Sequence, residues 1–323
     1  MKKSTAQVSI IISTQSCEDA VDALCLSLFC QNEKDMQIIF VDNDSTDNTL
    51  KLLKKYAEFD NRIEVYKHKC NNLLDACYFG LKKATAPYTL LLNGTQNIVL
   101  VQNCVYSMLE NMTQYRSDML YTSCCIITPA YDKLPLYQIS AQNFKTAVGK
   151  ELFCASDISA SLLFNLHLCP WGKMYKTEFL KSLTPEQHEV AFFLKCLFNA
   201  TKISYILDNL YLQKTGQEKL WQPDTFAEIK NCEQILLQYG QFEKYKNAFI
   251  GYKLHRIIEI FNNAAAEYKS PIFEQMKAEL FAIDYSRYDP NVLQKIGITS
   301  LLLKLIGLNY EQYIALYAEK ENG

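Results

Sequence analysis

The stretch Ile38–Asn48, which reads Ile-Ile-Phe-Val-Asp-Asn-Asp-Ser-Thr-Asp-Asn, decides the fold class. Its first four residues are apolar, and an uninterrupted apolar run is typical of a strand buried on both faces in a parallel sheet. The polar residues that follow include good helix N-caps, and helical spacing of apolar residues resumes over 49–56. Asp42 and Asn43 are then expected at the carboxyl end of the strand, where open α/β sheets hold ligands. The alternative is a strand-to-helix turn in which these side chains satisfy backbone groups alone.

The composition is that of an ordinary globular protein. The chain has 323 residues, of which 49% are hydrophobic and 21% charged, and its formal net charge is −2. This balance argues against a protein that grips nucleic acid by its phosphates. No window approaches the roughly 20 apolar residues of a membrane span. The apolar segment 298–308 contains Lys304 and is expected to be a packed helix, with contact to a membrane surface as the alternative.

Twelve cysteines are scattered through the chain without a Cys-x-x-Cys pair, and none has zinc-ligand spacing to one of the four histidines. Most lie in apolar segments, where a free thiol behaves as a small hydrophobic group. A disulfide framework is typical of short secreted chains, and no signal peptide is recognised at the start of the sequence. The sequence therefore predicts a reducing, cytoplasmic environment and no structural zinc.

Strands and helices are expected to alternate through the first hundred residues. Strands are predicted at 8–12, 38–41, 62–66 and 88–92, and helices at 18–31, 49–59 and 73–84. This alternation predicts βαβ units and a mainly parallel sheet. Further on, strands are predicted at 118–123 and 203–206, and helices at 103–115, 171–183 and 190–200. Residues 129–160 show no firm period.

Beyond residue 216 the pattern becomes helical throughout. Helices are expected at 225–239, 242–268, 271–281, 291–307 and 310–320. Because no Gly/Ser linker separates the two patterns, we expect a first domain at 1–215 and a helical region at 216–323 that packs on it.

The order of these pieces resembles that of the family 2 glycosyltransferases, which are inverting nucleotide-sugar enzymes with the GT-A fold. Members begin with a Val-Ser-Ile-Ile-Ile strand, as in Val8–Ile12, and a helix that ends Ser-Leu-x-x-Gln, as in Ser27–Gln31. Their second strand closes in Val-Asp-Asp-Gly-Ser-Thr-Asp, which is Val41–Asp47 here. Later landmarks fall at 60–63, 80–84, 117–118, 173–175 and 208–211. Over residues 7–215 the resemblance implies a GT-A (Rossmann-like), mainly parallel α/β sheet flanked by helices.

The resemblance also implies that a nucleotide-sugar donor binds at the strand ends. The residues that match the family's donor site are Ser13, Thr14, Asp42, Asn43, Asn93 and Thr95. Asn43 stands where the family's second carboxylate accepts a hydrogen bond from the uracil imide, and its amide oxygen can accept without carrying charge. Cys77 and Tyr78 replace an Arg-Asn pair that is often close to the phosphates, and Ser13–Ser16 replaces the usual Pro-x-x-Asn.

Asn93-Gly94-Thr95 stands where the family has the Asp-x-Asp that holds a divalent cation against the diphosphate. Mg²⁺ and Mn²⁺ bind through carboxylates plus substrate phosphates. An amide and a hydroxyl supply oxygen dipoles without net charge, so a cation carried in by the diphosphate would be held weakly. The sequence therefore predicts no protein metal ligands and no firmly bound cofactor.

Inverting transfer needs a general base that takes the proton of the acceptor hydroxyl. Family members often carry a Glu-Asp pair at the start of the helix before the last strand, and His188 and Glu189 fall at those positions. Glu189 stands where the base would be, and His188 is a second candidate for the base or its neighbour. The alternative is a solvated carboxylate that the helix dipole favours in the first turn.

Basic side chains or helix N-termini would have to balance the leaving diphosphate if no cation is held by carboxylates. Lys173, Lys176 and Lys214 are the candidates, since each lies near a segment that faces the carboxyl edge of the sheet in the family. The alternative is that they are ordinary surface lysines.

We therefore expect an inverting glycosyltransferase that moves a sugar from a nucleotide diphosphate, with a UDP-sugar as the first candidate, to a glycan or lipid-linked acceptor. Surface polysaccharide or glycoconjugate synthesis is the expected setting, with weak or no metal dependence. The alternative is a catalytically inactive relative that serves as a scaffold or binding subunit. Nucleic acid is not an expected partner. The C-terminal helices are expected to contact the acceptor, a protein partner or the inner face of a membrane.

Overall fold

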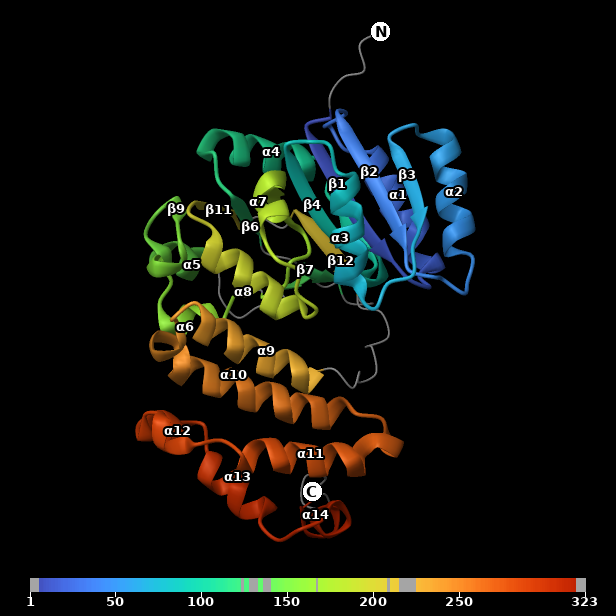
Figure 1. Cartoon of the computed structure of the whole chain (residues 1–323). Helices are drawn as coiled ribbons and strands as arrows, with labels where there is room; N and C mark the ends of the chain where they lie inside the picture. The colour runs from blue at the N-terminus through green and yellow to red at the C-terminus, as the bar shows by residue number, and fades with distance from the viewer. Residues whose placement is uncertain are drawn as a thin grey trace. The chain divides into compact units, whose positions relative to one another are not determined.

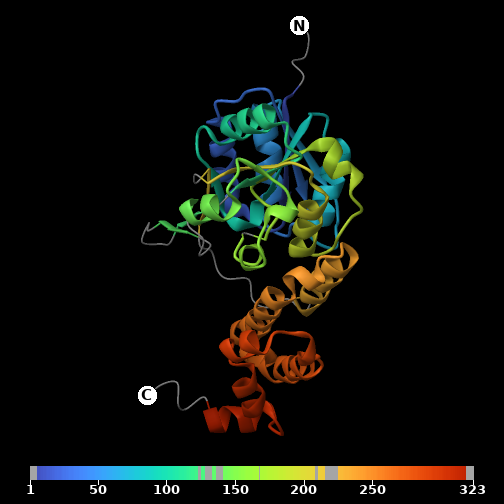
Figure 2. The ribbon, with the colours of Figure 1, turned by 90° about the vertical axis from the view of Figure 1, so that its left-hand side faces the viewer.

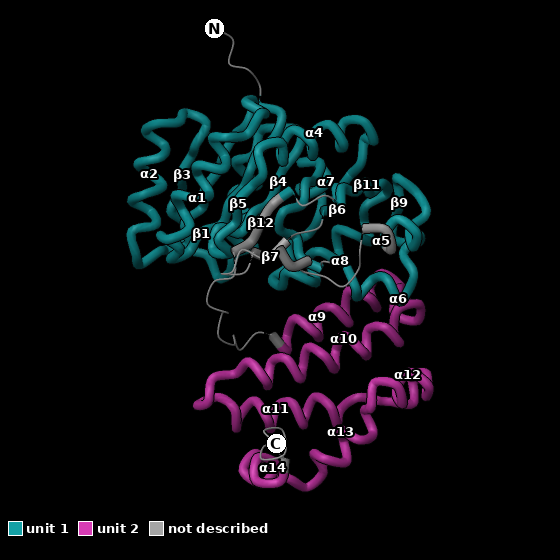
Figure 3. Tube along the Cα trace, turned by 180° about the vertical axis from the view of Figure 1, so that it is seen from behind, with its two compact units in different colours: residues 1–217 teal, residues 218–323 magenta. Residues whose placement is uncertain are grey.

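The computed structural model describes residues 6–122, 125–127, 133–135, 141–166, 168–207, 210–214 and 225–317. The chain divides into two compact units, residues 1–217 and 218–323 (Figure 3). The prediction that the helical region packs on the first domain stays a prediction.

The first unit is built on one large sheet. Its strands are β1 (Val8–Thr14), β2 (Met36–Asp42), β3 (Ile63–Lys67), β4 (Tyr88–Asn93), β6 (Met119–Thr122), β9 (Leu152–Phe153), β10 (Lys173–Lys176) and β11 (Ile203–Ile206). Their order is β3-β2-β1-β4-β10-β6-β11-β9. The pairs β3–β2, β2–β1, β1–β4 and β6–β11 are parallel, whereas β10 runs antiparallel to both β4 and β6. The predicted mainly parallel α/β sheet is confirmed.

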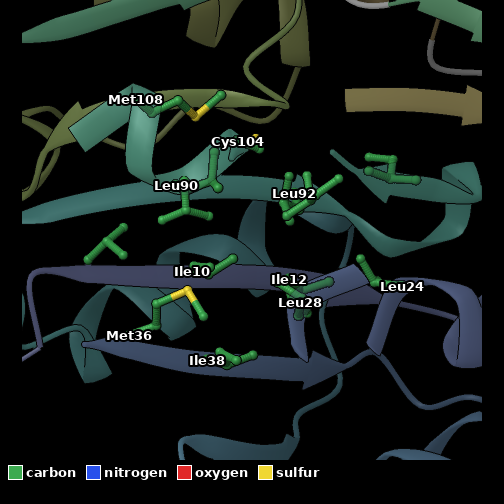
Figure 4. Close-up of a cluster of buried hydrophobic side chains, with 14 of the residues drawn as sticks. Ile10, Ile12, Leu24, Leu28, Met36, Ile38, Leu90, Leu92, Cys104 and Met108 are labelled. Carbon is green, nitrogen blue, oxygen red and sulfur yellow. The ribbon is translucent and has the colours of Figure 1, made fainter. Parts of the chain in front are cut away.

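Helices cover both faces of this sheet (Figure 1). The helices of this unit are α1 (Glu18–Phe29), α2 (Thr49–Phe59), α3 (Leu73–Lys83), α4 (Cys104–Tyr115), α5 (Ala141–Val148), α6 (Ala160–Leu163), α7 (Thr177–Ser182) and α8 (Glu189–Asn199). The apolar run of each central strand is buried completely, since alternate residues face different helices. The face that carries Ile10, Ile12 and Ile38 packs against Leu24 and Leu28 of α1 (Figure 4).

The opposite face of the sheet packs closely against α3 at Gly80. A Cβ added to Gly80 would lie 2.5 Å from Cγ2 of Ile11 and 3.4 Å from Cγ2 of Val41. Only a residue without a side chain therefore allows α3 to approach β1 this closely.

A smaller sheet accompanies the large one. Its strands are β5 (Ile98–Leu100), β7 (Cys125–Ile127), β8 (Lys133–Pro135) and β12 (Tyr211–Lys214), in the order β5-β12-β7-β8. Periodicity predicted none of β5, β7 and β8, since each has three residues.

Residues 171–183, predicted as one helical piece, instead form β10 followed by α7. Lys173–Lys176 is a strand because it fits between β4 and β6, with hydrogen-bonded neighbours on both sides.

The second unit consists of helices over its described residues (Figure 2). They are α9 (Thr225–Gln238), α10 (Phe242–Asn263), α11 (Lys269–Phe281), α12 (Pro290–Lys295), α13 (Ile298–Leu305) and α14 (Tyr310–Tyr317), and the predicted helical C-terminal region is thus confirmed. The helix predicted at 291–307 is interrupted, because Gly297 takes the left-handed conformation with φ +69° between α12 and α13. In the described part of the chain, no helix has both the length and the apolar character needed to cross a membrane.

Replacing Gly80 with alanine is expected to lower the free energy of unfolding by about 1 kcal/mol. Overpacking costs about 1–3 kcal/mol, which outweighs the gain of about 1 kcal/mol in helix propensity. Gly251 in α10 is the matched control, because no atom lies within 4 Å of its added Cβ. Gly251→Ala should stabilise the protein by about 0.5–1 kcal/mol in urea unfolding followed by circular dichroism. A Gly80→Ala variant that is also stabilised would contradict the close contact with Ile11.

Candidate functional site

The carboxyl ends of β1, β2 and β4 meet at one edge of the sheet. Thr14 is paired with Asp42 across β1 and β2, and Ser13 is paired with Asn93 across β1 and β4. The backbone N–H of Asn43 donates to the carbonyl of Thr14 at 2.8 Å. The structure therefore brings the residues of the predicted donor site together at this edge, which we call the strand-tip cluster: Ser13, Thr14, Asp42, Asn43, Asn93 and Thr95.

Asp42 is completely buried, and both of its carboxylate oxygens accept hydrogen bonds from Ser45. The Ser45 backbone N–H donates to Oδ2 at 3.2 Å, and the Ser45 hydroxyl donates to Oδ1. The turn is possible because Asp44 takes the left-handed conformation with φ +52°, which Asp tolerates better than most residues. The carboxylate is thus fixed in place by the strand-to-helix turn that follows it.

Asn43 connects the end of β2 to the loop after β3. Its Oδ1 accepts a hydrogen bond from the backbone N–H of Cys70 at 2.7 Å. An amide oxygen has two lone pairs, so one acceptor position remains for a ligand donor. The side chain that the sequence assigned to base recognition therefore also holds the loop.

Asn93 uses its side chain to cap the short 3₁₀ helix η1 (Gly94–Gln96). Its Oδ1 accepts from the backbone N–H of Thr95 at 3.0 Å and from the Thr95 hydroxyl at 2.7 Å. A Cβ added to Gly94 would lie 2.7 Å from Cγ2 of Thr14 and 3.1 Å from the carbonyl oxygen of Ser13. The turn after β4 therefore packs closely against the end of β1.

These side chains do not fit a tightly held Mg²⁺ or Mn²⁺. The oxygen of Asn93 already accepts two hydrogen bonds, and neither Asn93 nor Thr95 carries the negative charge that hard cations prefer. In the part of the chain that the structure describes, no three His, Cys, Asp or Glu side chains come together as a metal site.

The Ser13 hydroxyl is buried beside the thiol of Cys77 on α3. Burial raises the pKa of Cys77 well above its ordinary value, and the nearby Ser13 hydroxyl has a smaller effect in the opposite direction. Cys77 is therefore neutral near pH 7. Where family members often carry an arginine near the phosphates, this chain has an uncharged group behind the end of β1.

Glu189 begins α8, and the buried His188 is its N-cap residue. The indole Nε1–H of Trp171 donates to Oε2 of Glu189 at 2.7 Å. The charge of Glu189 is also one of the causes that raise the pKa values of Cys77 and Cys169, after the larger effect of burial. Trp171 precedes Gly172, whose N–H donates to the carbonyl of Leu91 two residues before Asn93, so the predicted base is linked through Trp171 to the end of β4.

Trp171 and Cys169 are the site residues that the sequence reasoning missed. Trp171 is one of only two tryptophans in the chain and stands two residues before Lys173, which was a candidate. The position of Trp171 close to Lys173 could have drawn attention to it. The hydrogen bond from Trp171 to Glu189 could not be predicted, because only the fold brings the two residues together.

The candidate lysines lie in different places. Lys173 is completely buried, and its Nζ lies 5.3 Å from the ring centroid of Tyr121 and 5.2 Å from that of Phe193. Burial raises the pKa of Cys169 to about 11, and the charge of Lys173 opposes this rise.

Lys176 is exposed and paired with Tyr88 at the amino end of β4, so it lies on the edge away from the strand tips. Lys214 lies in β12, paired with Ile127, and its side chain is outside the described part. The structure therefore brings neither lysine together with the strand-tip cluster, and the role in phosphate balancing stays a prediction for all three.

Comparison with known proteins adds independent information. Residues 9–157 match the model of glycosyl transferase family 2. The chain is 24% identical over 282 residues to a cholesterol galactosyltransferase of Borreliella burgdorferi, with 76% of each chain covered. It is 32% identical over 90 residues to the putative glycosyltransferase EpsE of Bacillus subtilis, which covers 27% of this chain and 32% of EpsE.

Among solved structures, the fold is similar to that of S. aureus TarS 1–349 in complex with UDP-GlcNAc. The TM-score is 0.66 and the identity 17%, with 93% of this chain and 90% of that chain covered. The GT-A architecture that the sequence predicted is therefore confirmed.

Replacing Asn43 with alanine is expected to lower the free energy of unfolding by about 1–2 kcal/mol, because the Cys70 N–H loses its acceptor. Asn43→Asp keeps an acceptor at the same place and should cost less. Urea unfolding of both variants measures the difference. Equal stability of Asn43→Ala and the wild type would show that this side chain does not hold the loop.

Proposed function

We propose that the chain is a member of glycosyl transferase family 2, whose model matches residues 9–157, and that it transfers a sugar from a nucleotide diphosphate donor with inversion at the sugar carbon. Glycosyl transfer is the reaction class of the family. The proposal adds Glu189 as the general base, a donor site at the strand tips, and weak or no dependence on a metal ion.

The grouping of polar residues in the strand-tip cluster is the main observation in favour of a donor site at the strand ends. Parallel α/β sheets bind ligands outside the carboxyl ends of their strands, and here three adjacent strands end in polar side chains. S. aureus TarS, whose fold is similar, was solved with UDP-GlcNAc, which supports a UDP-sugar as the donor. Asn43 then offers its remaining lone pair to the imide N–H of the base.

The acceptor is proposed to be a hydroxyl of a glycan or of a lipid-linked molecule. The name of the Borreliella burgdorferi relative, a cholesterol galactosyltransferase, supports a lipid hydroxyl as one acceptor class. The second unit offers a candidate contact region for such an acceptor, for a protein partner or for a membrane, since Leu303 is 67% and Ile306 59% exposed around α13.

In the proposed reaction, Glu189 accepts the proton of the acceptor hydroxyl as its oxygen attacks the sugar carbon. A new carbon–oxygen bond forms on one face while the bond to the diphosphate breaks on the other, and the diphosphate leaves with the electron pair.

Weak metal dependence is expected because the side chains at Asn93 and Thr95 are neutral. Among the three candidate lysines, Lys173 is paired with Leu91, two residues before the end of β4. Lys173, Lys176 and Lys214 remain candidates for balancing the leaving group. The competing hypothesis, a scaffold or binding subunit without turnover, rests on the same neutral positions.

Calorimetry with UDP and UDP-GlcNAc tests the donor site and the metal together. We expect binding whose dissociation constant changes by less than about twofold when Mn²⁺ is replaced by a chelator, because Asn93 and Thr95 offer no negative charge to a cation. The double variant Asn93→Asp, Thr95→Asp should instead bind UDP about tenfold more tightly with Mn²⁺ than with chelator. Loss of wild-type UDP binding in chelator would contradict metal independence, and no binding of UDP, GDP or their sugars would contradict the donor site.

Replacing Glu189 with glutamine is expected to lower turnover by about 10²–10⁴-fold while leaving the affinity for UDP unchanged, because the amide cannot accept a proton. Release of UDP from the donor sugar, with or without an acceptor, measures this. His188→Gln is the matched control at the neighbouring position and should retain most of the activity. Unchanged turnover in Glu189→Gln would remove this residue from the mechanism, and loss only in His188→Gln would transfer the role to the histidine.

A further inference from the structure

Glu189 is held by a side chain from a distant element. Trp171 lies two residues before the first residue of β10, is 1% exposed, and donates its indole N–H to Oε2 of Glu189 at 2.7 Å. The two residues are 18 positions apart in the chain. The bond therefore ties the first turn of α8 to the start of β10.

The backbone next to Trp171 is itself fixed by the sheet on both sides. The N–H of Gly172 donates to the carbonyl of Leu91 in β4 at 2.7 Å, and the hydroxyl of Thr122 at the end of β6 donates to the carbonyl of Gly172 at 2.7 Å. Gly172 has φ +70°, which a residue without a side chain adopts most easily. The backbone that carries the indole cannot shift along the sheet without breaking these bonds.

We propose that Trp171 is a positioning residue for the general base: its indole N–H holds one carboxylate oxygen of Glu189 and keeps the carboxylate charged and oriented toward the reacting hydroxyl. This rests on the proposed role of Glu189. A hydrogen bond donated to a carboxylate is stronger than one between neutral groups and favours the ionised form. A general base must also stay within a fraction of an ångström of its productive position relative to the reacting hydroxyl to reach its full rate acceleration.

The groups around Glu189 show why an uncharged hydrogen-bond donor such as the Trp171 indole N–H is important for its carboxylate. Among the described residues, the charge of Glu189 acts on the thiol of Cys77 on α3 and on the thiol of Cys169 before β10, and burial raises the pKa of both thiols. Lys173 on β10 acts on the thiol of Cys169, and His188 precedes Glu189 at the start of α8. Trp171 supplies a directed donor among these groups without adding a charge.

Nuclear magnetic resonance tests the contact without any need for turnover. Because the chain has only two tryptophans, protein labelled with ¹⁵N-tryptophan gives two indole signals, which a Trp221→Phe variant assigns. The Trp171 indole signal should titrate with the ionisation of Glu189, and Glu189→Gln should abolish that titration. A Trp171 signal that is independent of pH in the wild type would overturn the proposal.

Kinetics of Trp171→Phe test the functional role, because phenylalanine keeps an aromatic ring and removes the N–H. We expect kcat to fall by about 10–100-fold with little change in the affinity for UDP. The acid limb of the pH profile should move upward by about one pH unit, because the carboxylate loses a donor that stabilised its charged form. A merely structural role would lower activity without moving that limb.

Trp171→His, which retains a ring N–H, should recover part of the loss and provides a second variant if phenylalanine is not tolerated. An unmoved pH profile in Trp171→Phe, together with an inactive Glu189→Gln, would overturn the positioning role and leave the proposed function intact. Absence of turnover in the wild type would contradict the proposed function. In that case the titration of the indole signal would still show whether Trp171 donates a hydrogen bond to Glu189.

Discussion

The parallel pairing of β1 between β2 and β4 is the constraint on which the rest of the structure depends. Val8 is paired with Met36 on one side and Tyr88 on the other, and the register continues without a break to the strand ends. Both faces of these strands are buried, so a slip of one residue would move every side chain to the wrong face. Because the register is fixed, the polar residues after the three strands must meet at one edge.

The turns that follow the strands convert this shared edge into a preorganised cluster. Asn43 holds the Cys70 loop, Asn93 caps η1, and Gly94 allows the turn after β4 to lie against Thr14. Asn43 and Asn93 carry no net charge, whereas Asp42 brings a carboxylate to the strand tips. The chemistry proposed for the chain therefore depends on oriented dipoles and on Glu189, and little on a protein-bound cation.

The sequence predicted the elements whose signal is local. The apolar runs at 8–12 and 38–41 indicated parallel strands correctly, because a strand that is buried on both faces consists of consecutive apolar residues. The strand Lys173–Lys176 was predicted as helix, because four residues are too few to show the alternation of apolar and polar residues that identifies a strand. Its strand conformation depends on pairing with β4 and β6. Gly297 was read as part of a helix although its left-handed conformation ends one, a choice that depends on packing around it.

The candidate site was predictable to a similar degree. Ser13, Asp42 and Asn93 were placed together correctly, since the ends of adjacent parallel strands always share an edge. The burial of Lys173 between aromatic rings and the bond from Trp171 to Glu189 could not be foreseen, because each joins segments that only the tertiary fold brings into contact.

Hydrogen–deuterium exchange with and without UDP is the most direct measurement of the central claim that the strand tips form the nucleotide site. If the strand tips bind the nucleotide, exchange should become slower on UDP addition at residues 13–16, 42–46, 68–72 and 93–97, with little change across α10 and α11. Protection confined to other segments, or none at a UDP concentration that saturates binding, would contradict it.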